Sequence, residues 1–202
     1  MVRIGASETR GIVMSMALST SFGSLKHSGL DEAELWRHLI ATAVLADATT
    51  LGQVEHSEAF TAGLLHDIGR LAMAAQDPGR YANVVVMARR GVPATEGERI
   101  VFGMNHAQWG ESIGRAWDFP ADIVDAIADA IAEHHVGARH GLSWTVAHAR
   151  ELAASLGIGD GLLPPTPPDP ESESLMLPII AELGGEEAVI ERVEWYSSSF
   201  AA

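Results

Sequence analysis

The chain has 202 residues, of which 47% are hydrophobic and 20% charged, and this composition suits one compact globular domain with a small appendage. Its formal net charge of -14 argues against nucleic acid or an anionic membrane surface as a partner. Cysteine is absent, so disulfides and thiolate metal sites are excluded. No apolar run approaches the ~20 residues that cross a bilayer, and we expect a cytoplasmic protein.

Apolar residues recur with helical spacing almost throughout, which predicts an all-α fold. Asp31 and Glu34 have the spacing of a capping box, Ser57 and Ser143 are candidate N-caps, and Gly69 is expected to break or bend its helix. No Asn-Gly hairpin signal appears between alternating stretches. The predicted helices cover residues 3–22, 31–52, 57–77, 80–91, 94–103, 105–119, 121–135 and 143–157, and the helix over 31–52 is expected to be central.

The C-terminal quarter differs in composition. Residues 159–174 contain five prolines and no periodicity, which predicts a linker, and short helices are expected over 175–183 and 185–196. Residues 151–202 carry ten acids against one arginine, so we expect a solvated acidic face. The predicted organisation is a helical domain over 1–158, a proline-rich linker over 159–174, and an acidic helical appendage over 175–202.

His66 and Asp67 stand side by side in the apolar segment "AGLLHDIGRLAM", where an ionisable pair is costly unless it is paired or bound to a metal. The expected neighbours are His38 on the preceding helix, His106 in "GMNHAQWG", and His134 and His135 in "AEHH". Without cysteine, a transition-metal site must use histidine and carboxylate ligands. The alternative is a hydrogen-bonded core network without metal. The remaining histidines, His27, His56, His140 and His148, are predicted to lie on the surface.

These segments carry a family resemblance. The stretch around His66 and Asp67 resembles the signature of the HD superfamily. The ordered segments "LWRHLIATAVLAD", "FTAGLLHDIGRL", "FGMNHAQWGESIGRAWDFP" and "AIAEHH" resemble the HDOD domain, an HD-related output domain of bacterial signalling proteins. The resemblance extends over about residues 2–157. It implies an all-α, orthogonal helix bundle with a regulatory role, and catalysis is not generally established for such domains.

The resemblance also implies a ligand set. His38, His66 and Asp67 match the first metal ligands of the superfamily, while His106, His134 and His135 match further histidines of the related HD-GYP phosphodiesterases. The final superfamily ligand is an aspartate, and its position here is occupied by Arg150. An arginine has no lone pair for a metal, although it could pair with Asp67 or bind a phosphate.

Two further departures from the pattern concern this site. Arg70 replaces the lysine usual after the HD pair, which preserves the positive charge. The helix before His134 and His135 is about one turn longer than in the family, which displaces both residues by ~6 Å along its axis.

Two functions are therefore considered. The first is an HDOD-type bacterial signal-transduction module that acts through contacts with signalling proteins and without catalysis. The alternative is a metal-dependent phosphohydrolase for a cyclic dinucleotide, a nucleotide or another phosphoester, which would use Fe, Mn or Zn and the catalytic residues Asp67 and Arg70. HDOD domains usually carry further helices before the point where this chain begins. We therefore expect an exposed apolar N-terminal face, covered by a homo-oligomer or a partner chain.

Overall fold

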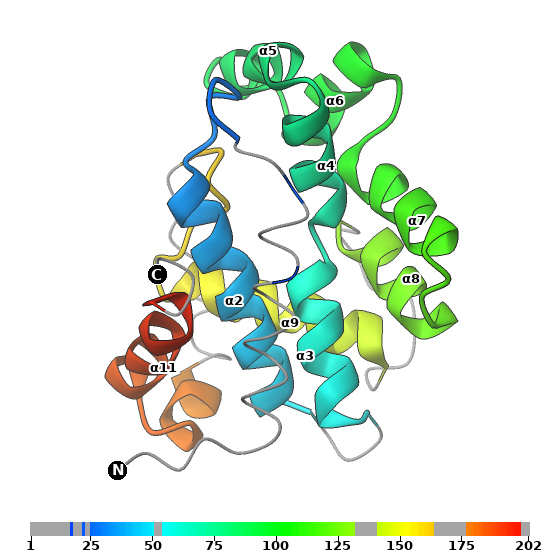
Figure 1. The fold of residues 1–202 in the computed structure, drawn as a ribbon. Helices are drawn as coiled ribbons and strands as arrows, with labels where there is room; N and C mark the ends of the chain where they lie inside the picture. Colours follow the sequence, from blue (N-terminus) through cyan, green and yellow to red (C-terminus); the bar gives the residue numbers. More distant parts are fainter. Residues whose placement is uncertain are drawn as a thin grey trace.

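The computed structural model describes residues 25–50, 54–131, 141–163 and 177–198, together with Ala17 and Phe22. Every regular element within these ranges is helical, which confirms the predicted all-α fold (Figure 1). The helices are α2 (Glu32–Ala48), α3 (His56–Leu65), α4 (Ile68–Gln76), α5 (Pro78–Ala88), α6 (Ala94–Phe102), α7 (His106–Ala116), α8 (Ala121–Asp129), α9 (Leu142–Ser155) and α11 (Glu186–Ser198), with a short helical turn over 177–182.

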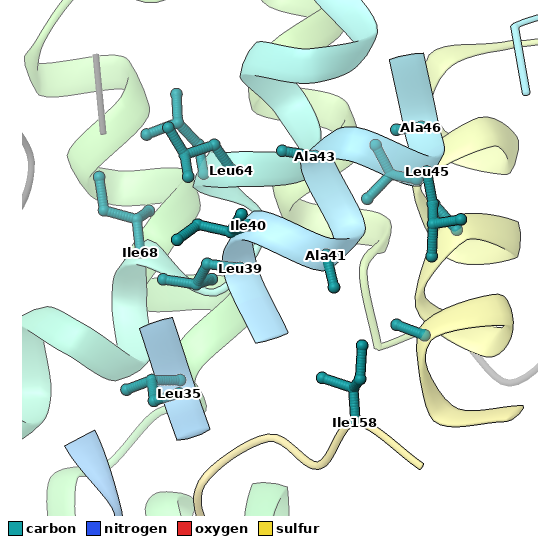
Figure 2. Packing of buried hydrophobic residues seen from close by; sticks show 14 of the residues in the cluster. Leu35, Leu39, Ile40, Ala41, Ala43, Leu45, Ala46, Leu64, Ile68 and Ile158 are labelled. Carbon is teal, nitrogen blue, oxygen red and sulfur yellow. The ribbon is translucent and has the colours of Figure 1, made fainter. Parts of the chain in front are cut away.

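Helix α2 lies at the centre of the bundle, as its sequence predicts. It packs against α3, α9 and α11 (Figure 1). The Asp31 side chain accepts a hydrogen bond from the Glu34 backbone N–H and caps the helix, which satisfies one otherwise unpaired donor. Beyond this cap most of α2 is buried, and Figure 2 shows its apolar side chains facing Leu64, Ile68 and Ile158 from three other segments. This central position lets α2 carry a polar side chain into the interior.

The predicted break at Gly69 is wrong by a few residues. Helix α3 ends at Leu65 and α4 begins at Ile68, so His66 and Asp67 themselves form the junction. Gly69 lies instead inside α4, where its missing side chain lets α4 pack directly on α7. The glycine therefore serves helix packing, and the HD pair lies where the chain changes direction.

Two predicted caps are also wrong. Helix α3 begins at His56, and its N-cap is Glu55, two residues before the cap expected at Ser57. Helix α9 begins after Gly141, two residues before the cap expected at Ser143. Neither start has a side-chain capping hydrogen bond, so packing against the rest of the bundle decides where these helices begin.

After α9, residues 158–163 form a non-helical segment that we call the strap, which reaches the N-terminal end of α2 (yellow in Figure 1). Ile158 and Leu162 of the strap are buried in the core. The proposed three-part domain division stays a prediction, because residues 164–176 of the expected linker lie outside the described residues.

Helix α11 returns to pack along α2. Its inner side chains Val189, Val193 and Tyr196 are buried. The Arg37 side chain on α2 donates a hydrogen bond from Nε to Glu194 Oε1 at 2.7 Å. The glutamates of this helix face solvent, in agreement with the expected acidic face.

Apart from Ala17 and Phe22, the predicted N-terminal helix over 3–22 lies outside the described residues, and so do the apolar N-terminal face and the histidines His134, His135 and His140. No helix in the described ranges has the length and apolar character that a membrane crossing requires.

Candidate functional site

The HD pair meets the histidine of α2 inside the bundle. Ligand atoms of His38, His66 and Asp67 all lie within 4.8 Å of one another, and the three residues are 5%, 0% and 2% exposed. The two imidazoles approach most closely, with 3.2 Å between their Nε2 atoms. The predicted convergence of these three residues from two separate helical segments is therefore present in the structure.

A hydrogen bond fixes the position of the ring proton of His66. His66 Nδ1 is 2.7 Å from the Gly63 carbonyl oxygen, which only accepts, so Nδ1 carries the hydrogen. Burial lowers the pKa of His66 to about 3 and that of His38 to about 4, so both rings are neutral near pH 7. The Nε2 atom of His66 therefore presents a lone pair toward His38.

Asp67 is ionised and paired within the protein. Burial opposes its ionisation, but the surrounding groups, chiefly the Arg70 guanidinium one turn later, together outweigh this effect and hold the pKa of Asp67 well below its usual range. Arg70 Nη1 lies 3.1 Å from Asp67 Oδ2, and the other oxygen, Oδ1, lies 3.3 Å from Nε2 of His106. Both oxygens of this carboxylate thus face side chains of the same chain.

His106 is the first residue of α7 and is held by Glu98 from α6. Glu98 accepts hydrogen bonds from Nδ1 of His106 at 2.6 Å and from its backbone N–H at 2.9 Å, while its other oxygen accepts from the Tyr81 hydroxyl at 2.8 Å. Because Nδ1 donates to Glu98, a neutral His106 ring directs its Nε2 lone pair at Asp67. That lone pair and the carboxylate oxygen repel unless a proton or a metal cation lies between them.

Sequence reasoning assigned no role to Glu98 or Asp160. The strap brings Asp160 to Arg70, whose Nη1 donates to Asp160 Oδ2 at 2.7 Å. The composition of the strap indicates a linker, so an isolated aspartate among glycines is the only feature of the sequence that marks Asp160. Together these contacts form a cluster of ionisable side chains, which we call the polar centre. Its members are His38, His66, Asp67, Arg70, Glu98, His106 and Asp160.

Arg150, on α9, lies close enough for its positive charge to lower the pKa values of His38, His66 and Asp67. It forms no ion pair within 4.0 Å of any described carboxylate, and its Nε atom is buried without a hydrogen-bond partner. Asp67 pairs with Arg70 instead, so the pairing with Arg150 considered from the sequence does not form. The cation nonetheless stands beside the histidine pair.

The structure thus brings together five of the predicted site residues, His38, His66, Asp67, Arg70 and His106. His27 and His56 are exposed as expected, whereas His148 is half-buried, stacked on Trp144, with an unpartnered Nε2 atom. The surface prediction for His148 is therefore wrong, because the Trp144 ring covers one face of its imidazole.

A metal ion fits the donor set of the polar centre. The Nδ1–H groups of His66 and His106 are bonded to a carbonyl and a carboxylate, the arrangement that orients metal-binding imidazoles. Tetrahedral ligand atoms on zinc are about 3.4 Å apart. The separations of 3.2 Å between the Nε2 atoms of His38 and His66, and of 3.3 Å between His106 and Asp67, are close to that value. The cations of Arg70 and Arg150 oppose a dication at the same place.

An all-helical bundle with a buried His–Asp pair at a helix junction, contacted by a histidine of the preceding central helix, defines a domain of the HD type. A family model for the HDOD domain matches residues 1–135, two thirds of the chain. The protein therefore belongs to the HDOD-domain family. No curated protein matches the sequence significantly.

Solved structures of similar fold cover nearly the whole chain. An HDOD domain protein of unknown function from Geobacter sulfurreducens matches 98% of this chain and 72% of its own, with a TM-score of 0.75 and 20% identity. A candidate phosphohydrolase from Shewanella amazonensis SB2B matches 98% and 74%, with a TM-score of 0.69 and 22% identity. A candidate signal transduction protein from Marinobacter aquaeolei VT8 matches 98% and 44%, with a TM-score of 0.64 and 19% identity. These likenesses extend the fold assignment over the full chain.

Proposed function

We propose that this protein is a regulatory HDOD module of bacterial signal transduction, which acts through contacts with other signalling proteins and does not hydrolyse phosphoesters. The observation that carries the proposal is the state of Asp67. Its side chain is almost completely buried, and its two oxygens face Arg70 and His106 of the same chain. The carboxylate that would bind a metal is thus already engaged inside the protein.

Metal-assisted hydrolysis needs an open coordination position and room for a water and a phosphoester. Here the ring atoms of His66 are fully buried, and His38 and His106 are 5% and 2% exposed. Two arginines add positive charge to the centre, which weakens binding of a dication. Burial and charge therefore both support a regulatory role for this member of the family.

The likeness to the Marinobacter protein, described as a candidate signal transduction protein, is consistent with this role. We propose signalling proteins as partners and the cytoplasm as the compartment, since a bacterial output domain of this kind acts on cytoplasmic proteins.

The proposal is tested by producing the protein with Mn and Fe supplied, beside a His66→Ala/Asp67→Ala double variant. Metal content and hydrolysis of bis-p-nitrophenyl phosphate and a cyclic dinucleotide are then measured for both. We expect hydrolysis by the wild-type protein to equal that of the double variant. Stoichiometric metal together with hydrolysis, both lost in the double variant, would contradict a purely regulatory role.

A metal-dependent phosphohydrolase is the second candidate, and one observation favours it. The lone pair of His66 Nε2 is fixed by the Gly63 carbonyl, and a neutral His106 ring would present a lone pair to Asp67, as in a prepared metal site. In that case His38, His66, Asp67 and His106 would hold the metal, and Arg70 would contact the phosphate, while His134 and His135 would supply further ligands. One structural neighbour is itself described as a candidate phosphohydrolase. The same experiment decides between the two functions.

A further inference from the structure

The strap is seated on the first turns of α2 by several independent contacts. The Asp31 backbone N–H donates to the Gly161 carbonyl at 2.8 Å, and the Gly159 N–H donates to the Glu34 carboxylate at 2.9 Å. Gly161 has φ +75°, and a Cβ atom there would lie 2.6 Å from the Asp31 carbonyl oxygen. The strap therefore fits α2 in one register and at close range.

The strap contacts the same face of α2 that carries His38 into the polar centre. Glu34 and Leu35, which contact the strap, precede His38 by four and three residues. Residues at these spacings share one helix face. The strap thus crosses the helix within a turn of the histidine that pairs with His66.

Asp160 connects the strap to the interior. Its Oδ1 accepts the Leu162 backbone N–H at 3.1 Å, which closes a turn in the strap, while Oδ2 accepts from Arg70 Nη1. The Asp160 side chain is 33% exposed, whereas those of Arg70 and Asp67 are 5% and 3% exposed. Asp160 is therefore the point at which this chain of charges reaches solvent.

A single nitrogen of Arg70 bridges the two aspartates, at 2.7 Å from Asp160 and 3.1 Å from Asp67. The Nε atom of the same guanidinium is buried without a hydrogen-bond partner in the described part of the chain. The position of Arg70 thus depends on both carboxylates, one from the junction just before its own helix and one from the strap. Removal of the strap carboxylate leaves Asp67 as its closest partner and uncovers the guanidinium.

We propose that the strap is a latch over the polar centre, closed by the Arg70–Asp160 ion pair. In the closed state Arg70 and Asp67 are sealed from solvent. When the strap detaches, Asp160 leaves Arg70, and the centre opens beside His38. Any partner that binds or pulls the segment after α9 would thereby control access to the centre. This device regulates the same centre that the proposed function concerns, but it operates whether or not the centre holds a metal.

The test is hydrogen–deuterium exchange of the full chain combined with labelling of arginine by phenylglyoxal. Asp160→Asn keeps the Oδ1 acceptor of the turn and removes the charge. We expect it to raise exchange in residues 158–163 by about tenfold or more, and to make Arg70 reactive. The matched control is Asp125→Asn, since Asp125 is exposed on α8, and it should leave both readings at the wild-type level.

A second variant keeps the test decisive if Asp160→Asn proves unstable. Glu34→Ala removes the acceptor for the Gly159 N–H outside the polar centre, so it should also raise strap exchange and expose Arg70. Wild-type-level exchange and an unlabelled Arg70 in the folded variants would overturn the latch. Labelling of Arg70 already in the wild-type protein would overturn it as well. Neither reading depends on metal or hydrolysis, so failure of the latch is distinct from failure of the proposed function.

Discussion

Glu98 and His106 are joined by two hydrogen bonds, since one Glu98 carboxylate oxygen lies 2.6 Å from the ring Nδ1 of His106 and 2.9 Å from its backbone nitrogen. The second oxygen accepts the Tyr81 hydroxyl. Burial opposes ionisation of Glu98, but the hydrogen bonds from His106 and the charge of the nearby Arg70 together outweigh it and hold the pKa of the carboxyl below its usual value. One buried carboxylate therefore joins α5, α6 and α7 at the edge of the polar centre.

Replacement of Glu98 by glutamine should destabilise the protein by about 3–5 kcal/mol, because a buried charge partner is lost and an amide cannot accept from all three donors. Urea unfolding at pH 7 measures the change. Glu96→Gln is the matched control, since Glu96 is exposed on the same helix, and it should shift stability by less than about 0.5 kcal/mol. Equal stability of the two variants would contradict the role assigned to Glu98.

Stability should fall as the pH drops from about 6.5 toward 4. His38 and His66 have pKa values lowered to about 4 and about 3, chiefly by burial, so the unfolded chain binds more protons than the folded one in this interval. Two such groups give a slope of at most about 2.7 kcal/mol per pH unit. Below about pH 4 the lowered pKa values of Asp67, Glu98 and Asp160 add a further loss, since protonation removes their pairing.

Urea titrations at pH 7, 6 and 5, with a chelator present, measure this dependence. His38→Gln should reduce the slope, because one of the two neutral buried rings is gone. His27→Asn is the control, since His27 is exposed and has φ +73°, which asparagine tolerates. A stability that is flat across this interval would show that the two rings are not held neutral by burial.

Gly69→Ala should prevent folding or lower the free energy of unfolding of the protein by about 3 kcal/mol or more. A Cβ atom at Gly69 would collide with the His106 carbonyl oxygen and lie 2.6 Å from the Gly110 nitrogen, where α4 crosses α7. These atoms belong to the backbone of α7, which leaves little room for relaxation. At Gly79, in contrast, the nearest atom is 3.8 Å away, so Gly79→Ala should fold normally. Circular dichroism and thermal unfolding compare the two variants.

Arg150→Asp should increase the affinity of the polar centre for Mn or Zn by at least about tenfold, since a positive charge beside His38 and His66 becomes a negative one. Isothermal titration calorimetry on the chelator-treated protein measures this change. Arg115→Asp provides the control, because Arg115 is exposed and pairs with Glu111 on α7. Unchanged affinity in Arg150→Asp would show that this arginine does not govern metal binding.

The sequence predicts well those features that local interactions determine. The Asp31 cap and the end of α9 before Gly157 follow from short-range patterns, as does the helix predicted over 80–91, which the structure places at Pro78–Ala88. The meeting of His38, His66 and Asp67 also follows, because they lie on consecutive segments that pack together. Features that depend on packing between distant parts of the chain cannot be predicted from short-range patterns. The break at His66 and Asp67 is one example, since the helical periodicity continues through it.

Asp160 shows most clearly what sequence reasoning misses. A proline- and glycine-rich composition predicts a flexible connection, yet the strap is fixed by contacts with Asp31, Glu34 and Arg70, which lie 90 or more residues away. No local pattern encodes a partner at that distance. Glu98 was missed for a related reason: its role depends on the fold of α5 and α7 around it.

The placement of Arg70 has a consequence for how the protein unfolds. Its guanidinium contacts carboxylates of Asp67, Glu98 and Asp160, which come from three segments well separated along the chain. Loss of α6 beneath the closed strap leaves a buried charge with too few partners, and that state is high in free energy. Partial unfolding of α6 alone is therefore disfavoured, and this helix should come apart with the rest of the bundle in one cooperative transition.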